Sequence, residues 1–343
     1  MTTLLSSIVF TMCWRVWLLV PSGIRRRAYI RLKNRYQTRP FEATRLAFGL
    51  RFKWTFFDPR IEANNTRFVL DNTTIPVPRV LDVLPPVKTT DSRGIIIMEW
   101  IDGETLSSWA SDRTKWPEEY QHHIARLMGD DTMSTSELDD LQAILKHAVP
   151  TVDVSDGQGL IDDLHNAVSQ LRAIPPPSSS TVSGLDGQPL IWSRCLGTHQ
   201  LLQPTSLPDF HRLLINQVGY QVRIPHVLQA AEPVLHRKYR MCFTHSDLHT
   251  DNILVKDGKL AAIIDWECAG WYPEYWECTM LNYHSTLRRT TDVFWKQVDL
   301  FGGDYEEELS LERILWQSSG DGAVRPGDLP GNPLDQPIDA AIQ

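Results

Sequence analysis

Three polar side chains that can handle a metal ion or a proton lie within nineteen residues of one another: Asp247, Asn252 and Asp265. Between the last two, a pair of apolar runs flanks the dipeptide Asp257-Gly258. An Asp-Gly pair between apolar runs is a strong signal for a β-hairpin. We therefore expect a hairpin that brings Asp265 back toward Asn252.

This set of side chains predicts a phosphoryl-transfer site. Asp247 is a carboxylate that can accept a proton, and Asn252 and Asp265 offer oxygen ligands of the kind that Mg²⁺ prefers. Phosphoryl transfer needs a base at the acceptor hydroxyl, metal ligands at the phosphate oxygens and a lysine on the phosphates. An alternative is a Zn²⁺ site at His245-x-Asp247-x-His249, but it would leave Asn252 and Asp265 without a role.

A lysine and a glutamate upstream are candidates for the remaining parts of such a site. Residues 46–54 read as a strand with Lys53 near its end, and Asp58-Pro59 reads as the N-cap and first turn of a helix that continues to about residue 70. A carboxylate on the inner face of that helix needs a cation, and Lys53 is the nearest candidate for Glu62. The alternative is that Glu62 is a solvated surface residue.

The next elements predict a small lobe joined to a larger helical one. The prolines of residues 75–81 favour an extended edge strand, and the continuous apolar run of residues 94–100 is typical of a buried strand. Asp102-Gly103 then breaks the chain, which suits a hinge between lobes. Apolar spacing predicts helices over about 160–171 and 207–215, and another helix is expected before Arg240.

The N-terminal segment combines apolar and basic residues. Residues 4–20 are apolar except for small polar residues and Arg15, and a series of arginines and lysines follows before the first acidic residue, Glu42. The run is shorter than the ~20 residues that span a bilayer, and it lacks the leading positive charge of a secretory signal. A helix packed on the body of the protein is expected. Weak contact of residues 4–35 with a membrane surface is the alternative.

Composition restricts the class of protein and its compartment. With 343 residues, 42% hydrophobic and 22% charged, the chain is globular and long enough for about two lobes. A formal net charge of −8 argues against a nucleic-acid partner. The five cysteines are odd in number and widely spaced, so they support neither a disulfide framework nor a zinc site. A reducing, cytoplasmic environment is expected.

The motifs HSDLHTDN and IIDWE resemble those of the aminoglycoside phosphotransferase and choline kinase family, in which Trp-Glu follows the metal-binding aspartate. The order of LRFKW, EANNTRFV, IPVPRVL, IIIMEWIDGETL and AGWYPEYWE is similar to the fungal branch of that family. The resemblance spans residues 44–318 and implies an α+β, protein-kinase-like fold of two lobes. The expected parts are an apolar and basic helical extension (1–43), an N-lobe (44–101), a C-lobe with the catalytic loop and metal-binding hairpin (102–318) and a flexible tail (319–343).

The resemblance also implies a role for each candidate residue. Asp247 would be the catalytic base, with Asn252 and Asp265 as the Mg²⁺ ligands. Lys53 would hold the α- and β-phosphates of ATP and pair with Glu62. The backbone of Glu99, Trp100 and Ile101 would face adenine, and His245 would brace the catalytic loop. The implied cofactors are ATP and Mg²⁺, and the implied reaction moves the γ-phosphate to a hydroxyl of a small molecule.

Two features depart from the family pattern. The only glycines before Lys53 are Gly23 and Gly49, so no G-x-G-x-x-G phosphate loop is present before it. Thr250-Asp251 also stands where Pro-Arg is expected. The missing glycine loop and the basic N-terminus motivate an alternative function, a catalytically inactive kinase-like module that binds a ligand or partner or has a regulatory role.

Acidic and aromatic residues mixed between 251 and 277 suggest the kind of acceptor. Such a mixture suits a cationic amine or a quaternary ammonium group, which favours a small aminated alcohol. The alternative is that the aromatic rings are core and the acids are solvated. The residues concerned are Asp251, Glu267, Glu274 and Glu277 with Trp266, Trp271, Tyr272, Tyr275 and Trp276.

Overall fold

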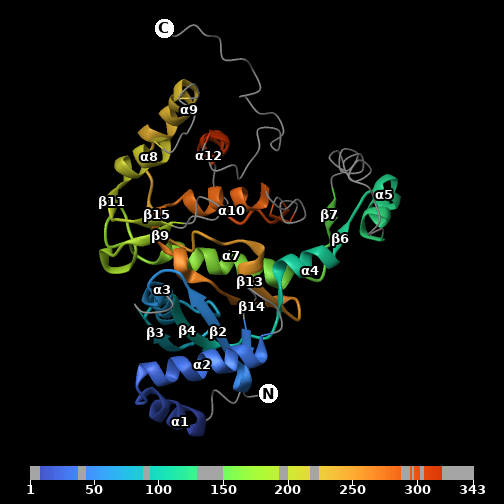
Figure 1. Ribbon diagram of the computed structural model, residues 1–343. Coiled ribbons are helices and arrows are strands. Elements are labelled where there is room, and N and C mark those ends of the chain that lie inside the picture. The colour runs from blue at the N-terminus through green and yellow to red at the C-terminus, as the bar shows by residue number, and fades with distance from the viewer. Residues whose placement is uncertain are drawn as a thin grey trace.

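The computed structural model describes residues 8–37, 44–87, 93–129, 150–192, 200–216, 224–286, 294–295, 297–301 and 305–318. A small lobe built on an antiparallel sheet lies at one end of the molecule, and a larger, mainly helical lobe lies at the other (Figure 1). The first two helices, α1 and α2, extend the small lobe on the side away from the large one (Figure 1).

The N-lobe sheet has the strand order β1-β2-β4-β3 with antiparallel neighbours. Helix α3 (Pro59–Asn72) packs on it and begins as predicted, because the Asp58 side chain accepts a hydrogen bond from the Arg60 amide. The predicted inner strand is β4, whose apolar residues are buried. The strands are β1 (Thr44–Leu46), β2 (Leu50–Thr55), β3 (Val80–Leu84) and β4 (Gly94–Glu99).

Two strand predictions in this lobe need correction. The strand expected over residues 46–54 is interrupted by a 3₁₀ turn, η2 (Ala47–Gly49), in which Phe48 and Gly49 have φ values of 64° and 69°. Two successive left-handed residues reverse the chain, so β1 and β2 form a hairpin. The strand expected over residues 75–81 begins later, at Val80, because prolines cannot donate to a ladder. Its predicted position at the sheet edge is correct.

The N-terminal residues form a helical hairpin on the sheet, made of α1 (Ile8–Leu18) and α2 (Ser22–Tyr36). The indole N–H of Trp14 donates to the carbonyl of Leu81 at 3.0 Å, and that of Trp17 donates to the Tyr29 hydroxyl at 2.6 Å. Arg25 forms a buried ion pair with Asp82 of β3. The inner face of the hairpin therefore packs on the body of the protein, as expected.

The C-lobe is built from helices around short strands. Helix α7 is the amphipathic helix predicted over 160–171, α8 is the one predicted over 207–215, and α9 is the one expected before Arg240. The helices and 3₁₀ turns are α4 (Leu106–Asp112), α5 (Glu118–Gly129), α7 (Gln158–Ala173), η3 (Leu185–Gly187), α8 (Leu207–Asn216), α9 (Ile224–His236), η5 (Thr250–Asn252), η6 (Trp266–Cys268), α10 (Trp276–Thr286) and α12 (Glu306–Ser318).

Two buried clusters of apolar side chains form the core of this lobe. One lies around α4, α7 and the strands beside them, and the other lies around α8, α9, α10 and α12. The strands are β5 (Glu104–Thr105), β6 (Thr114–Lys115), β7 (Thr151–Val152), β8 (Thr181–Val182), β9 (Leu190–Trp192), β10 (Gln200–Leu202), β11 (Thr205–Ser206), β12 (Met241–Thr244), β13 (Ile253–Lys256), β14 (Lys259–Ile263) and β15 (Gly270–Pro273).

The hairpin predicted around Asp257-Gly258 is present as β13 and β14. Both turn residues have positive φ, 52° and 70°, as a type I′ turn requires. At the open end of the hairpin the amide of Ile264 donates to the carbonyl of Asn252 at 2.9 Å. The segment that carries Asp265 therefore starts beside Asn252, as the sequence predicts.

One prediction concerns residues that are not described. The flexible tail expected over 319–343 lies entirely outside the described residues. Cys13, Cys242, Cys268 and Cys278 are free thiols. Among the helices described, none combines the length and apolar character needed to cross a bilayer.

Candidate active site

Lys53 joins the two lobes through carboxylates from α3 and from the segment that follows β14. It projects from β2 and donates to Glu62 Oε2 of α3 at 2.7 Å, and it also contacts Asp265, which follows β14 in the C-lobe. The Lys53 Nζ atom lies 3.4 Å from Oε2 of Glu267. The predicted pairing of Lys53 with Glu62 is thus present in the geometry, and the ammonium group also reaches the aspartate expected to bind metal.

The carboxylates at this point outnumber the cations. Oxygen atoms of Glu62, Asp265 and Glu267 lie within 4.8 Å of one another around the single Lys53 ammonium group. Burial lowers the pKa of Lys53, but the three carboxylates outweigh burial and raise it well above its usual value. For Asp265, burial is outweighed by Lys53, which lowers the pKa to about 2. The excess negative charge and the oxygen donors fit a divalent cation.

The pKa of Glu62 shifts upward, in the opposite direction to that of Asp265. Burial raises its pKa to about 7, and repulsion from Asp265 and Glu267 adds to the shift, while Lys53 opposes it. The folded protein therefore keeps a proton on Glu62 that the unfolded chain releases near its ordinary pKa of 4.5.

This shift predicts a pH dependence of stability. Because the folded state binds this proton more tightly than the unfolded state, protonation of Glu62 stabilises the fold. This contribution to the free energy of unfolding is complete below about pH 4.5 and is lost as the pH rises toward about 7. We expect Glu62→Gln to flatten the curve of unfolding free energy against pH in this window, by on the order of 1–3 kcal/mol. Urea unfolding of wild type and variant across the window measures the effect. Parallel curves for the two proteins would contradict the predicted protonation of Glu62.

The loop between β12 and η5 carries His245 and Asp247. The His245 side chain is fully buried; its Nε2 lies 3.0 Å from the carbonyl of Ile264, and its Nδ1 lies 3.2 Å from the amide N of Asp247. Burial lowers the pKa of His245, so the ring is neutral and donates through Nε2. His245 thus links the loop to the residue before Asp265, which fits a bracing role.

Asn252 is oriented by the loop. Its Nδ2 donates to the Asp247 carbonyl at 2.9 Å and to Asp247 Oδ2 at 3.2 Å, which directs the amide nitrogen inward. Within the described part of the chain, its Oδ1 receives no hydrogen bond. An amide oxygen that accepts no hydrogen bond from these residues is suited to bind a hard cation such as Mg²⁺.

Glu277, in the first turn of α10, holds the backbone of the same loop. Its carboxylate accepts from the amide of His245 at 2.6 Å and from that of Ser246 at 3.1 Å. Ser246 has a φ of 66°, and its Oγ accepts from the Trp276 indole at 2.9 Å. Burial raises the pKa of Glu277 to about 7, and the backbone N–H groups oppose the rise. The loop is therefore shaped by a buried carboxylate rather than by its own sequence alone.

In the linker expected to face adenine, two of the three backbone amides donate hydrogen bonds within the protein. The amide of Glu99 donates to the Arg79 carbonyl at 2.9 Å, and that of Trp100 donates to the Gly49 carbonyl at 2.8 Å. The Glu99 side chain pairs with Arg79 at 3.0 Å. Of the three predicted residues, Ile101 is the one whose amide makes no backbone hydrogen bond within the described residues.

The aromatic residues proposed to surround a cationic acceptor belong to the core. Their rings are at most 3% exposed, so they present no face to a ligand: Trp266, Trp271, Tyr272, Tyr275 and Trp276. The acids among them have other partners. Glu274 pairs with Arg172 and Arg240, Glu277 holds the loop, and Glu267 joins the Lys53 cluster. The argument from aromatic faces therefore fails. Asp251 lies in the loop itself, with its side chain 32% exposed and its Oδ2 atom 3.9 Å from His249 Nδ1.

Sequence reasoning missed the roles of Glu267 and Glu277. Glu267 lies two residues after Asp265, and this spacing was available as a signal for a second carboxylate at the cation cluster. No local signal marks Glu277, because its partners are backbone amides thirty-one and thirty-two residues earlier in the chain.

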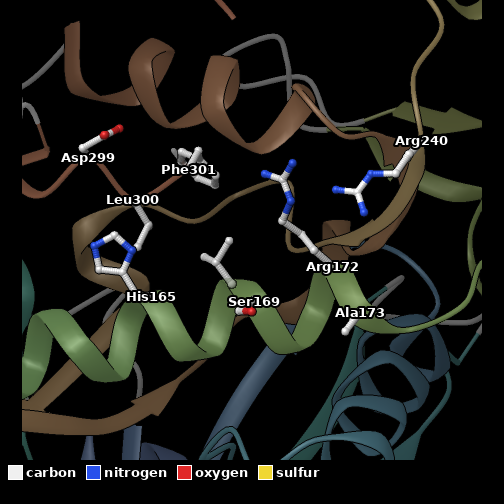
Figure 2. Close-up of a pocket in the computed structure, with 9 residues that line it drawn as sticks. His165, Ser169, Arg172, Ala173, Arg240, Asp299, Leu300 and Phe301 are labelled. Atoms are coloured by element: carbon white, nitrogen blue, oxygen red, sulfur yellow. The ribbon is translucent and has the colours of Figure 1, made fainter. Parts of the chain in front are cut away.

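A separate hollow of about 570 Å³ lies against α7 and contains none of the predicted site residues. His165, Ser169 and Arg172 project into it from α7, with Arg240 and Phe301 opposite (Figure 2). Glu274 lies 3.4 Å from Arg172 and 3.1 Å from Arg240, so one carboxylate offsets part of their charge. None of the residues that line this hollow belongs to the Lys53 cluster, and we do not assign the reaction to it.

A small antiparallel lobe, a helical lobe, and a catalytic-type loop followed by a hairpin together define a protein-kinase-like fold. The model of the phosphotransferase enzyme family (APH) matches residues 64–297, which is more than half of the chain. The chain therefore belongs to this phosphotransferase family. The predicted family and the predicted α+β, two-lobe fold class are thus confirmed.

Solved structures with some similarity include three named proteins. A thermostable mutant of aminoglycoside phosphotransferase APH(4)-Ia, in ternary complex with ADP and hygromycin B, is 14% identical with a TM-score of 0.47 over 80% of each chain. Aminoglycoside-3'-phosphotransferase of type VIII is 15% identical with a TM-score of 0.43, over 84% of this chain and 97% of that one.

The third is a putative fructosamine-3-kinase from Haemophilus somnus 129PT, 11% identical with a TM-score of 0.45 over 78% of this chain and 73% of that one. All three TM-scores lie below 0.5, so the family assignment depends on the family model. A search of curated protein sequences found no match.

Proposed function

We propose that this protein is an ATP- and Mg²⁺-dependent phosphotransferase that moves the γ-phosphate of ATP to a hydroxyl group of a small molecule. The observation that carries the proposal is the contact of Lys53 with both Glu62 and Asp265 across the two lobes. This arrangement assembles a phosphate-binding cation and a cluster of metal-binding oxygens at one point, as phosphoryl transfer requires.

Each residue then has a defined task. Asp265 and the Asn252 Oδ1 would hold Mg²⁺, with Glu267 as a further carboxylate at the same cluster. Lys53 would bind the α- and β-phosphates and is kept in place by Glu62. Bound Mg²⁺ would neutralise charge on the phosphate oxygens. The Ile101 amide would donate to adenine.

Asp247 would take the proton from the acceptor hydroxyl. Its amide donates to His245 Nδ1, and Glu277 holds the amides of the two residues before Asp247. Its Oδ2 accepts from Asn252 at 3.2 Å, which holds the carboxylate beside the metal ligand. The second carboxylate of the loop, Asp251, supports an acceptor that carries positive charge, because it adds negative charge close to Asp247.

Binding of nucleotide tests the proposal against the alternative of an inactive module. We expect ATP with Mg²⁺ to raise the unfolding temperature of the wild type, because a ligand that binds only the folded state stabilises it by RT ln(1 + [L]/Kd). Asp265→Ala should lose the Mg²⁺-dependent part of the shift. Asp257→Asn, at the exposed hairpin turn, should keep it.

A second measurement asks whether phosphate is transferred. Incubation with γ-labelled ATP and an extract of small metabolites should give a labelled product with the wild type and none with Asp265→Ala. Absence of a thermal shift at millimolar ATP and Mg²⁺ would remove the enzyme proposal. A shift without any labelled product from a range of hydroxyl compounds would favour the inactive module.

A further inference from the structure

Helix α1 is apolar on two faces, and the residues that the structure describes cover one of them. Trp14 and Trp17 pack against the cluster formed by Tyr29 and the N-lobe sheet, where the Trp14 indole donates to the Leu81 carbonyl of β3 and the Trp17 indole donates to the Tyr29 hydroxyl of α2. On the opposite side Met12 and Val16 of α1, and Leu19 in the turn directly after the helix, are 64%, 66% and 83% exposed. Their spacing of four and three residues places them on one ridge. A helix that is apolar on both faces normally has a second apolar environment.

Positive charge is concentrated in the same hairpin. Eight basic residues and no acidic residue precede Glu42, whereas the whole chain carries −8, so residues 42–343 carry −16. On α2 the side chains of Arg27, Arg31 and Arg35 recur every four residues and are exposed. In the described part of the chain they form no ion pair, unlike Arg25, which pairs with Asp82.

We propose that the α1–α2 hairpin docks the protein on the surface of an anionic lipid membrane. The apolar ridge of Met12, Val16 and Leu19 would enter the boundary between headgroups and acyl chains, and the arginine stripe of α2 would bind lipid phosphate and carboxylate groups. The attachment is peripheral, since the Trp14 and Trp17 side of α1 stays packed on the protein.

The chemistry of the surface selects this occupant over two others. A nucleic acid would use the arginines but gives no partner for an aliphatic ridge. A second copy of the chain would cover the ridge but would bring two strongly basic hairpins together, which costs electrostatic energy. An anionic bilayer satisfies both the ridge and the stripe.

The hairpin lies at the end of the molecule away from the C-lobe (Figure 1). Docking there does not require contact of the membrane with the loop that carries Asp247. The inference is independent of the proposed reaction, because it uses no residue of the candidate active site.

Co-sedimentation of the full chain with vesicles tests the proposal. We expect binding to vesicles of phosphatidylcholine and phosphatidylserine, weaker binding to phosphatidylcholine alone, and loss of binding as salt is raised. The triple variant Arg27→Gln, Arg31→Gln, Arg35→Gln should bind on the order of 10²-fold more weakly, from a contribution of about tenfold or less per basic residue.

The ridge is tested by the triple variant Met12→Gln, Val16→Gln, Leu19→Gln, which should also release the protein from the vesicles. These side chains are exposed, so the unfolding temperature should stay close to that of the wild type. Matched controls are Leu228→Gln with Leu235→Gln on α9, and Arg60→Gln with Arg67→Gln and Arg212→Gln. All of these replace exposed residues outside the hairpin, and they should bind vesicles as the wild type does.

Several results would overturn the proposal. One is the absence of wild-type binding to phosphatidylserine vesicles, and another is equal loss of binding in the hairpin variants and their controls. A dimer in light scattering that the ridge variant dissociates would assign the ridge to a second copy. Binding of a single-stranded RNA that is lost with the arginine variant and unaffected by the ridge variant would assign the stripe to nucleic acid.

Discussion

Asp247→Asn is expected to lower the rate of phosphate transfer by about 10²–10⁴-fold, the range that a positioned general base contributes. The affinity for ATP and Mg²⁺ should change by less than about threefold, because Asn252 is held mainly by the backbone carbonyl of Asp247, which the substitution leaves in place. Single-turnover transfer of labelled phosphate measures the first quantity, and a thermal-shift titration with nucleotide measures the second.

The control for this variant is Asp257→Asn. Asp257 is an exposed aspartate at the turn of the same hairpin, and asparagine tolerates its positive φ of 52°. Both transfer and nucleotide binding should be preserved in the control. Full turnover by Asp247→Asn would exclude Asp247 as the base, and loss of nucleotide binding would instead point to a structural role for its carboxylate.

Local signals were sufficient to predict much of the fold and several of the contacts of the site. The Asp257-Gly258 turn, the Asp58 cap of α3 and the apolar run of β4 each depend on neighbours in the sequence, and each is present. Glu62 pairs with Lys53 because one turn of α3 and one strand place them together nine residues apart. Local periodicity and capping carry this information.

Features that depend on distant contacts were not predictable in this way. The break at Phe48 and Gly49 has no Asn-Gly or Asp-Gly signal, and it is stabilised by the Trp100 amide, which donates to the Gly49 carbonyl. The sequence pattern of the aromatic residues after Asp265 fits buried core residues and exposed ligand-binding residues equally well, and only their burial distinguishes the two. Glu277 accepts hydrogen bonds from backbone amides, which every residue except proline has, so the pattern of side chains in the sequence does not reveal these partners.

The N-terminal hairpin has one face packed on the protein and one face exposed. The apolar and basic pattern was compatible with a packed helix or with membrane contact. In the structure the aromatic side of α1 is partly buried against the N-lobe cluster, and its aliphatic side is exposed. Packing of Trp14 and Trp17 on the sheet fixes the orientation of the helix, so the exposed ridge is presented as a rigid surface. Such a surface loses less conformational entropy on binding than a mobile peptide would.

The largest effect on stability is expected from Glu277→Ala. The substitution leaves the buried amides of His245 and Ser246 without their acceptor, and each unsatisfied donor costs roughly 1–3 kcal/mol, so the free energy of unfolding should fall by about 2–6 kcal/mol. Glu277→Gln keeps one acceptor oxygen and the side-chain volume, and it should lose about half as much. Urea unfolding measures both variants.

The Glu277 variants also distinguish the effect of loop position on the transfer rate from an effect on nucleotide binding. Glu277 contacts the loop backbone, so Glu277→Gln should lower transfer by about 10²-fold through displacement of Asp247. Nucleotide binding should be lowered less, because the Lys53 cluster does not include Glu277. Glu307→Ala, an exposed carboxylate in the first turn of α12, is the matched control and should change stability by less than about 1 kcal/mol. Equal stability of Glu277→Ala and this control would show that the loop keeps its shape without the buried carboxylate.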